Sequence, residues 1–300
     1  MKKIFNIIMT LSILSLLFLT SCGSAPQTDS NTLAVLASTS FLADIAQNVA
    51  GDRVQVQSLL PIGADPHAYQ AAPADVAKIA ESDLLILNGL EYEHFIESLL
   101  ENAGGERIIV EATAGLEPHQ MEEHEAGDPH MWLDPNLVIK YVENIRDGFI
   151  QVDPVGKDIY TANAAAYIVE LQELDAWIVE QVNTIPAERR KLVTNHDVFG
   201  YFAERYGFEI ADAILPSFSS QVNASAQEIA DSIDAIRASG APAIFLGEVE
   251  NADLANQIAS ETDVKVVDTL YLEALSDGEP APTYIEMMKY NVTQIVSVLK

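Results

Sequence analysis

Three histidines in this sequence stand in settings that suit metal coordination. They occur in Asp65-Pro66-His67, in Asp128-Pro129-His130 and in Asn195-His196-Asp197. Each imidazole has a carboxylate one or two residues away, and a metal-ligating histidine commonly donates its second ring N–H to such a group, which fixes the aim of the ring. Proline also restricts the backbone just before His67 and His130, so less conformational freedom is lost on binding. We therefore expect a metal site in which Asp65, Asp128 and Asp197 orient three ligands.

These histidines do not form a local binding motif. The sequence has no His-Glu-x-x-His and no two histidines three or four residues apart, which excludes the metal-binding helix of zincin-type metalloproteases. A single histidine beside proline and aspartate is more often a helix cap or a residue at the edge of the core than a ligand. Ligands so far apart in the sequence must be brought together by the fold.

Short apolar runs alternate with amphipathic stretches along most of the chain, which predicts an α/β fold. Strands are expected over residues 32–37, 54–60, 84–87, 107–110, 191–195, 210–214, 243–246 and 265–270. Helices are expected between them, for example over 41–49 and 73–81. This alternation is typical of βα units on mostly parallel sheets. His67 and His196 then follow strands, at the edge of the sheet where ligands of such folds collect.

Residues 153–185 lack this alternation and predict one long helix. Asp153-Pro154 starts the helix and Pro186 ends it. Apolar side chains recur at helical spacing between them: Ile159, Ile168, Leu171, Leu174, Ile178 and Val182. Such a helix extends about 45–50 Å at a rise of about 1.5 Å per residue. We therefore predict two pseudo-symmetric α/β lobes, residues 32–152 and 186–300, joined by one long rigid helix.

The N-terminus resembles a secretion signal. Lys2 and Lys3 precede an apolar run over residues 4–19 that is short and one-sided for a membrane span. The sequence Leu19-Thr20-Ser21-Cys22-Gly23 resembles the lipobox of bacterial lipoproteins, in which the cysteine is lipidated and becomes the first residue after cleavage. Cys22 is the only cysteine in the chain, so it cannot form an internal disulfide. The alternative interpretation is a thiol that lies near a cleavage site by chance. We expect a signal peptide at 1–21, a lipid on Cys22, a flexible tether at 22–31 and an extracytoplasmic folded part held at the bacterial cell membrane.

The composition indicates a folded protein that attracts cations. Hydrophobic residues make up 49% of the 300 residues, which is enough for one large or two medium domains. The 16 basic and 45 acidic residues give a formal net charge of -29, which repels nucleic acid and draws cations. This excludes nucleic-acid binding but identifies no particular cation, because most of these carboxylates are expected on solvated helix faces.

Two stretches around the histidines are distinctive: GADPHAYQ at residues 63–70 and PHMWLDP at residues 129–135. Together with the lipobox, they make the chain similar to the metal-binding lipoproteins of bacterial ABC importers for zinc and manganese, the cluster A-I or cluster 9 solute-binding proteins. The resemblance covers nearly the whole chain after Cys22. It implies two α/β lobes, one backbone helix and one metal ion in the cleft between the lobes. It also implies a monomer that captures the ion and hands it to an ABC transporter permease without catalysing a reaction.

The resemblance places the first three ligands on histidines of this chain: His67, His130 and His196. Many manganese-type members have glutamate at the third position. The fourth ligand of the family is usually an aspartate, which aligns here with Glu273 in TLYLEALS, residues 269–276. This carboxylate is one methylene longer, so Asp268 and Glu248 remain alternatives. The other interpretation of Glu273 is a surface acid at the start of a helix.

Three neutral imidazoles and one carboxylate favour Zn²⁺, because this ion prefers a tetrahedral set of nitrogen and oxygen ligands and Mn²⁺ prefers more oxygen. We expect zinc as the cargo, with manganese as the alternative, since some three-histidine members of the family are considered able to carry both. His94 is expected to pack at a helix edge. His119 and His124 lie in the acidic stretch 117–125, which is either an exposed loop or a weak metal shuttle.

Two other functions stay open. A zinc hydrolase needs a coordination position open to water and a nearby general base, so it is favoured only if Glu273 does not bind. A metal-dependent adhesin is the second alternative, a role attributed to some members of the family, although the sequence contains no dedicated adhesion module.

Overall fold

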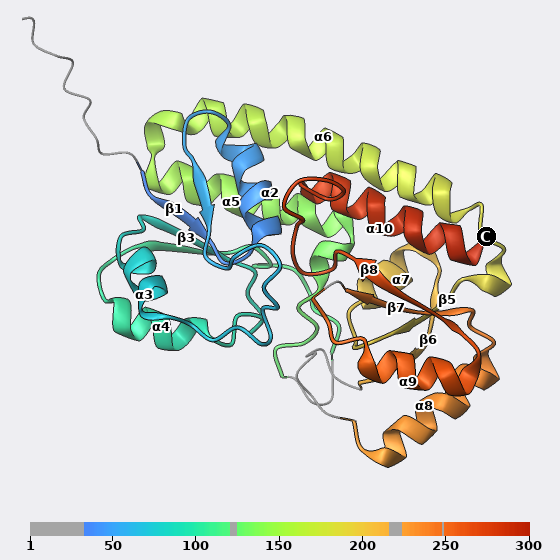
Figure 1. Cartoon of the computed structure of the whole chain (residues 1–300). Coiled ribbons are helices and arrows are strands. Elements are labelled where there is room, and N and C mark those ends of the chain that lie inside the picture. The colour runs from blue at the N-terminus through green and yellow to red at the C-terminus, as the bar shows by residue number, and fades with distance from the viewer. Residues whose placement is uncertain (1–32, 121–124, 216–223, 248) are drawn as a thin grey trace, which may run out of the picture. The chain divides into compact units, whose positions relative to one another are not determined.

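The computed structural model describes residues 33–120, 125–215, 224–247 and 249–300, and it contains two four-stranded sheets (Figure 1). The first sheet has the strand order β2-β1-β3-β4, and each neighbouring pair is parallel. We call this sheet with its helices the N-terminal lobe. Its elements are β1 (Val35–Ala37), α2 (Ser40–Ala50), β2 (Val56–Ser58), α3 (Pro73–Ala80), β3 (Leu84–Leu87), α4 (Ile96–Ala103), β4 (Ile108–Glu111) and α5 (Pro135–Val152).

The second sheet has the order β6-β5-β7-β8 and is also parallel throughout. We call this sheet with α7, α8 and α9 the C-terminal lobe. The elements of this half are β5 (Lys191–Thr194), α7 (Gly200–Tyr206), β6 (Glu209–Ala213), α8 (Ala226–Ser239), β7 (Ala243–Gly247), α9 (Asp253–Thr262), β8 (Lys265–Leu270) and α10 (Tyr284–Leu299). The central strands β3 and β7 are buried along their whole length, as expected for parallel sheets covered by helices.

The two sheets have one topology, because β5, β6, β7 and β8 take the places of β1, β2, β3 and β4. This confirms the predicted α/β fold with two pseudo-symmetric lobes. All eight expected strands are present, and their ends differ from the prediction by a few residues. The strand expected over 54–60 ends at Ser58, although the N–H groups of Leu59 and Leu60 still donate to the oxygens of Ala37 and Ser38. The expected signal peptide, Cys22 and the tether lie outside the described residues.

The long helix predicted between the lobes is α6 (Lys157–Val182), preceded by one 3-10 turn at Pro154–Gly156. Its 26 residues extend about 39 Å, less than the predicted length, because the α-helix begins after the 3-10 turn and already ends at Val182. Ile159 is 45% exposed and does not belong to the buried stripe. Tyr160, Ala164 and Tyr167 begin that stripe instead. No helix in the described ranges combines the length and the apolarity that crossing a bilayer requires.

Residues 271–283, which we call the return segment, connect β8 to α10 and contact the N-terminal lobe. The backbone N–H of Leu275 donates to Ser40 Oγ at 2.9 Å, and the N–H of Tyr284, the first residue of α10, donates to Asp44 Oδ2 at 2.9 Å. Both acceptors lie on α2. Helix α10 then packs along α6 (Figure 1). The return segment and the start of α10 are therefore hydrogen-bonded to α2 of the N-terminal lobe.

Candidate metal centre

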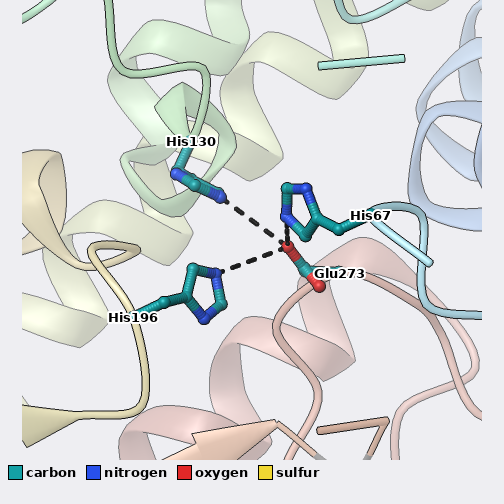
Figure 2. A group of neighbouring side chains, drawn as sticks. All are labelled: His67, His130, His196 and Glu273. Atoms are coloured by element: carbon teal, nitrogen blue, oxygen red, sulfur yellow. Dashed lines mark hydrogen bonds and ion pairs between the residues drawn. The ribbon is translucent and has the colours of Figure 1, made fainter. Parts of the chain in front are cut away.

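Four side chains from distant parts of the chain converge at one point (Figure 2). His67 lies in the loop after β2, His130 in the long connection after β4, His196 directly after β5 and Glu273 in the return segment. One ligand atom of each lies within 4.8 Å of those of the other three. The fold therefore brings together the four residues that the resemblance named as ligands.

The distances between these atoms suit a small tetrahedral ion. Glu273 Oε1 lies 2.6 Å from His67 Nε2, 3.6 Å from His130 Nε2 and 3.7 Å from His196 Nε2. Ligands about 2.0 Å from a tetrahedral zinc ion stand about 3.3 Å from one another. The imidazoles point toward the carboxylate rather than away from it (Figure 2). Small adjustments would therefore place all four around one ion.

The cluster is shielded from solvent and contains polar atoms without partners. The side chains of His67, His130 and His196 are 0% exposed and that of Glu273 is 1% exposed. Within the described part of the chain, His67 Nδ1, His130 Nε2, His196 Nε2 and Glu273 Oε2 have no hydrogen-bond partner. Burying polar atoms in this way is unfavourable unless something binds them. A cation bound by the three Nε2 atoms and Glu273 Oε1 would satisfy the two unpartnered nitrogens that face the carboxylate, His130 Nε2 and His196 Nε2.

Carboxylates around the cluster orient two of the rings. Asp128 Oδ1 accepts from the backbone N–H of His130 at 2.9 Å and lies 2.8 Å from its ring Nδ1, as the sequence predicted. Asp65 Oδ1 accepts from the backbone N–H of His67 at 2.8 Å, so the hydrogen bond in this first Asp-Pro-His is to the backbone and not to the ring. The same tripeptide sequence thus gives a contact with the ring at His130 and a contact with the backbone at His67.

The ring of His196 is oriented by Glu250, a residue that the sequence analysis missed. Its Nδ1 lies 2.5 Å from Glu250 Oε1, and both side chains are buried. Glu250 Oε2 in turn accepts from the backbone N–H of Gly247, the last residue of β7, at 2.6 Å. Asp197 was expected to orient His196, but Glu250 makes the contact with the ring, and Asp197 lines a pocket with His119 and Asp128. The missed signal was an acid just beyond a predicted strand, at the edge where sites of parallel sheets form.

Burial and neighbouring charges shift the pKa values of three side chains in the cluster. Burial lowers the pKa of His196, but Glu250 and Glu273 outweigh it and raise the pKa from 6.5 to about 10. Burial also lowers the pKa of His130, and Asp128 and Glu273 again raise it above its ordinary value. For Glu273, burial raises the pKa, but the three imidazoles hold it well below its usual range. The carboxylate is therefore ionised at neutral pH, as a ligand must be.

The described cluster does not include the remaining candidates. Asp268 is exposed on β8, so it is not part of the cluster, and Glu248, Cys22 and His124 lie outside the described residues. His94 is exposed in the turn before α4. His119 stacks on Tyr201 with ring centroids 4.0 Å apart, and its Nε2 lies 2.6 Å from Glu204 Oε2.

Comparison with known proteins identifies the family. The family model described as "Zinc-uptake complex component A periplasmic" matches residues 35–298. The chain belongs to this family. Among its relatives, the manganese-binding lipoprotein MntA of Halalkalibacterium halodurans is 36% identical over 90% of this chain and 90% of its own. The manganese ABC transporter substrate-binding lipoprotein PsaA of Streptococcus pneumoniae is 30% identical over 100% of this chain and 99% of its own.

Solved structures of periplasmic metal-binding proteins share the fold. The periplasmic zinc-binding protein TroA of Treponema pallidum superposes with a TM-score of 0.82 at 29% identity, covering 88% of this chain and 98% of its own. These relatives are named as binding proteins and not as enzymes, in agreement with the expectation that the chain is not an enzyme. Their names specify different metals, so family membership alone does not select the ion.

Proposed function

We propose that this protein is the extracytoplasmic binding component of an ABC importer and that it carries a divalent transition-metal ion on His67, His130, His196 and Glu273. The observation that carries the proposal is the convergence of four buried ligand atoms within 4.8 Å. The family supports it, because a relative that matches the whole chain is named as the substrate-binding lipoprotein of an ABC transporter. A membrane permease is then the partner that receives the ion.

We propose Zn²⁺ as the preferred ion. Three ring nitrogens and one carboxylate oxygen at nearly tetrahedral separations match the coordination of zinc, whereas Mn²⁺ favours a site with more oxygen and a larger coordination number. For one site of nitrogen and oxygen ligands, divalent zinc also binds more tightly than manganese. Manganese is the second candidate, since two relatives are named for it.

Binding rather than catalysis follows from the closed ligand set. A catalytic zinc keeps one coordination position for water, whereas four protein ligands fill the tetrahedron. The burial of all four side chains supports this, because a water nucleophile would need access to the ion. For delivery, we propose that a signal peptide at 1–21 exports the chain, that lipidated Cys22 anchors it, and that it acts as a monomer on the tether 22–31.

Metal content with competition tests the choice of ion. The purified protein is first stripped with a chelator, then titrated with zinc in the presence of a chelating dye, and finally challenged with excess manganese. We expect one zinc per chain and retention of zinc against manganese. Displacement by equimolar manganese would overturn the zinc preference, and absence of any bound transition metal would overturn the proposed function.

The variant His130→Ala tests the site itself. We expect zinc affinity to fall by more than about 100-fold, a larger effect than that of outer contacts to metal ligands. The far-ultraviolet circular dichroism spectrum should stay unchanged. His94→Ala is the matched control, because His94 is exposed outside the cluster. Equal affinities of the two variants would remove His130 from the site.

A further inference from the structure

Glu273 follows a strand of the C-terminal lobe, but its neighbours in the chain are hydrogen-bonded to the N-terminal lobe. The carbonyl of Leu272 accepts from Trp132 Nε1 at 2.7 Å, and the N–H of Leu275 donates to Ser40 Oγ at 2.9 Å. Resting on the proposed function, we propose that Trp132 and Ser40 are positioning residues that attach the carboxylate ligand to the N-terminal lobe. His67, His130 and Glu273 then form one half-site of three ligands, and His196 is the single ligand from the C-terminal lobe.

Trp132 is itself held rigidly, which lets its indole fix the return segment. The side chain is fully buried and stacks on Phe41 of α2, with ring centroids 4.6 Å apart and planes at 27°. The carbonyl of Trp132 accepts from the hydroxyl of Tyr284 at 2.6 Å. Trp132 therefore contacts both ends of the return segment, through Leu272 at its start and through Tyr284 just beyond its end.

The two hydrogen bonds to the return segment lie on either side of the ligand. One is made to residue 272 and the other to residue 275, so the backbone that carries Glu273 is held from both directions. Upstream, the segment leaves the second sheet at Tyr271, whose N–H and carbonyl both bind the side chain of Asn291 on α10. Because a ligand must be held within about 0.5 Å of its productive position, the orientation of this short stretch of backbone decides whether the carboxylate reaches the ion.

The position of the carboxylate agrees with this assignment. Glu273 Oε1 lies 2.6 Å from His67 Nε2, the shortest of its distances to the three imidazoles. The side chain thus lies closest to a ligand of the lobe that holds its backbone. A half-site preassembled in this way loses less conformational freedom on capture than four independently placed ligands.

Two substitutions remove the proposed hydrogen bonds separately. Trp132→Phe removes the indole donor and keeps an aromatic ring, and Ser40→Ala removes the hydroxyl acceptor. We expect each to weaken zinc affinity about 10- to 100-fold, as for other residues that orient metal ligands. Trp177→Phe on α6 is the matched control and should leave zinc affinity unchanged. Thermal unfolding of the metal-free proteins shows whether each variant is folded.

Double-mutant cycles distinguish positioning of Glu273 from a general effect on the fold. If Trp132 and Ser40 act through this ligand, neither substitution should weaken zinc binding further in a Glu273→Ala background. Both should keep their full effect in a His196→Ala background. Trp132 also neighbours His130, with ring centroids 5.1 Å apart, so a His130→Ala background is included.

Each outcome is decisive. Loss of affinity that is additive with Glu273→Ala, or coupled to His130→Ala instead, would overturn the positioning role, as would normal affinity in both Trp132→Phe and Ser40→Ala. Failure of the parent chain to bind any divalent transition metal would instead overturn the proposed function, so the two failures can be told apart.

Discussion

The two lobes share one strand order but supply their ligands differently. In each half of the chain one proposed ligand follows the fourth strand: His130 after β4, and Glu273, in the return segment, after β8. The other two ligands break the symmetry, because His67 follows the edge strand β2 whereas His196 follows the central strand β5. Because the two sheets share one topology, their carboxyl edges are equivalent. The loops that follow the strands then determine which side chains reach the proposed site.

The lobes also differ in how they orient an imidazole. In the N-terminal lobe, Asp128 reaches the ring of His130 from only two residues away. In the C-terminal lobe, Glu250 reaches the ring of His196 from the loop after another strand. The first arrangement is local and the second depends on the assembled sheet. The proposed half-site adds a further difference, since it makes the N-terminal lobe the principal holder of the ion.

The largest expected effect separates the ligands of the two lobes. His67→Ala removes a ligand of the three-ligand half-site and should lower zinc affinity by more than about 100-fold, beyond the effect of outer contacts. His196→Ala leaves that half-site intact, so we expect a smaller loss, of about 10- to 100-fold. Competition with a chelating dye measures both. Equal losses, or a larger loss in His196→Ala, would show that the lobes hold the ion evenly.

The next effect compares the carboxylates that orient the rings. Glu250→Ala and Asp128→Ala should each weaken zinc binding about 10- to 100-fold, because the imidazole loses the partner that fixes its tautomer and direction. Isothermal titration with a competing chelator gives the affinities. Glu250→Gln keeps an oxygen that can accept from Nδ1 and should recover part of the loss. No change in Glu250→Ala would mean that the position of His196 depends on packing alone.

The pH dependence should report mainly on the C-terminal lobe. Because the pKa of His196 is about 10, the metal-free protein keeps this proton at neutral pH and zinc must displace it. Zinc affinity should therefore rise about tenfold per pH unit between pH 7 and 9, where an ordinary imidazole is already neutral. His196→Ala should show a smaller slope over this range, because the His196 proton is gone and only His130, whose pKa is also raised, is left to add to it. A parent protein with constant affinity from pH 7 to 9 would contradict the pairing with Glu250.

The same raised pKa affects the stability of the metal-free protein. Its folded value lies above the unfolded value of 6.5, so the contribution of His196 to the free energy of unfolding is complete below pH 6.5 and is lost as the pH rises toward 10. Chemical denaturation of the parent protein and of His196→Ala at pH 6 and pH 9 measures this contribution. The two stability curves should converge as the pH rises.

The smallest effect concerns the two Asp-Pro-His stretches. Asp65 binds the backbone of His67 and not its ring, so Asp65→Ala should reduce zinc affinity less than about tenfold, below the range for carboxylates that contact a ligand ring. Asp128→Ala, measured under the same conditions, is the comparison. Equal losses would mean that a backbone hydrogen bond positions a ring as well as a ring contact does.

Much of the fold could be predicted because its signals are local. Apolar runs and helical periodicity depend on neighbouring residues, and the eight strands and α6 were found in this way. The start of α5 shows the same short-range chemistry, because Asp134 accepts from the N–H of Asn136 as a helix cap and Pro135 is the first helical residue. The apolar stripe of α6 was drawn from aliphatic residues alone, so it included the exposed Ile159 and omitted the buried Tyr160 and Tyr167.

Contacts made only by the assembled fold could not be predicted from spacing. Glu250 and Trp132 meet their partners through the arrangement of strands and the path of the return segment. Asp197 was expected to orient His196 because the two are adjacent in the sequence, but both lie in the bend after β5, where adjacency does not determine which side chains meet. The convergence of the four proposed ligands was predicted by resemblance to a family, and the distances among them came only from the structure.

In the connection that leads to His130, hydrogen bonds join His119 to Asp128 both directly and through Tyr201. The N–H of Asp128 donates to the carbonyl of His119 at 3.0 Å, and the hydroxyl of Tyr201 accepts from the N–H of His119 and donates to the carbonyl of Asp128. A side chain at Gly127 would meet the His119 carbonyl at 2.7 Å, so this glycine must be kept. Because Asp128 also contacts the ring of His130, a distortion of the backbone at Gly127 would be transmitted to that imidazole.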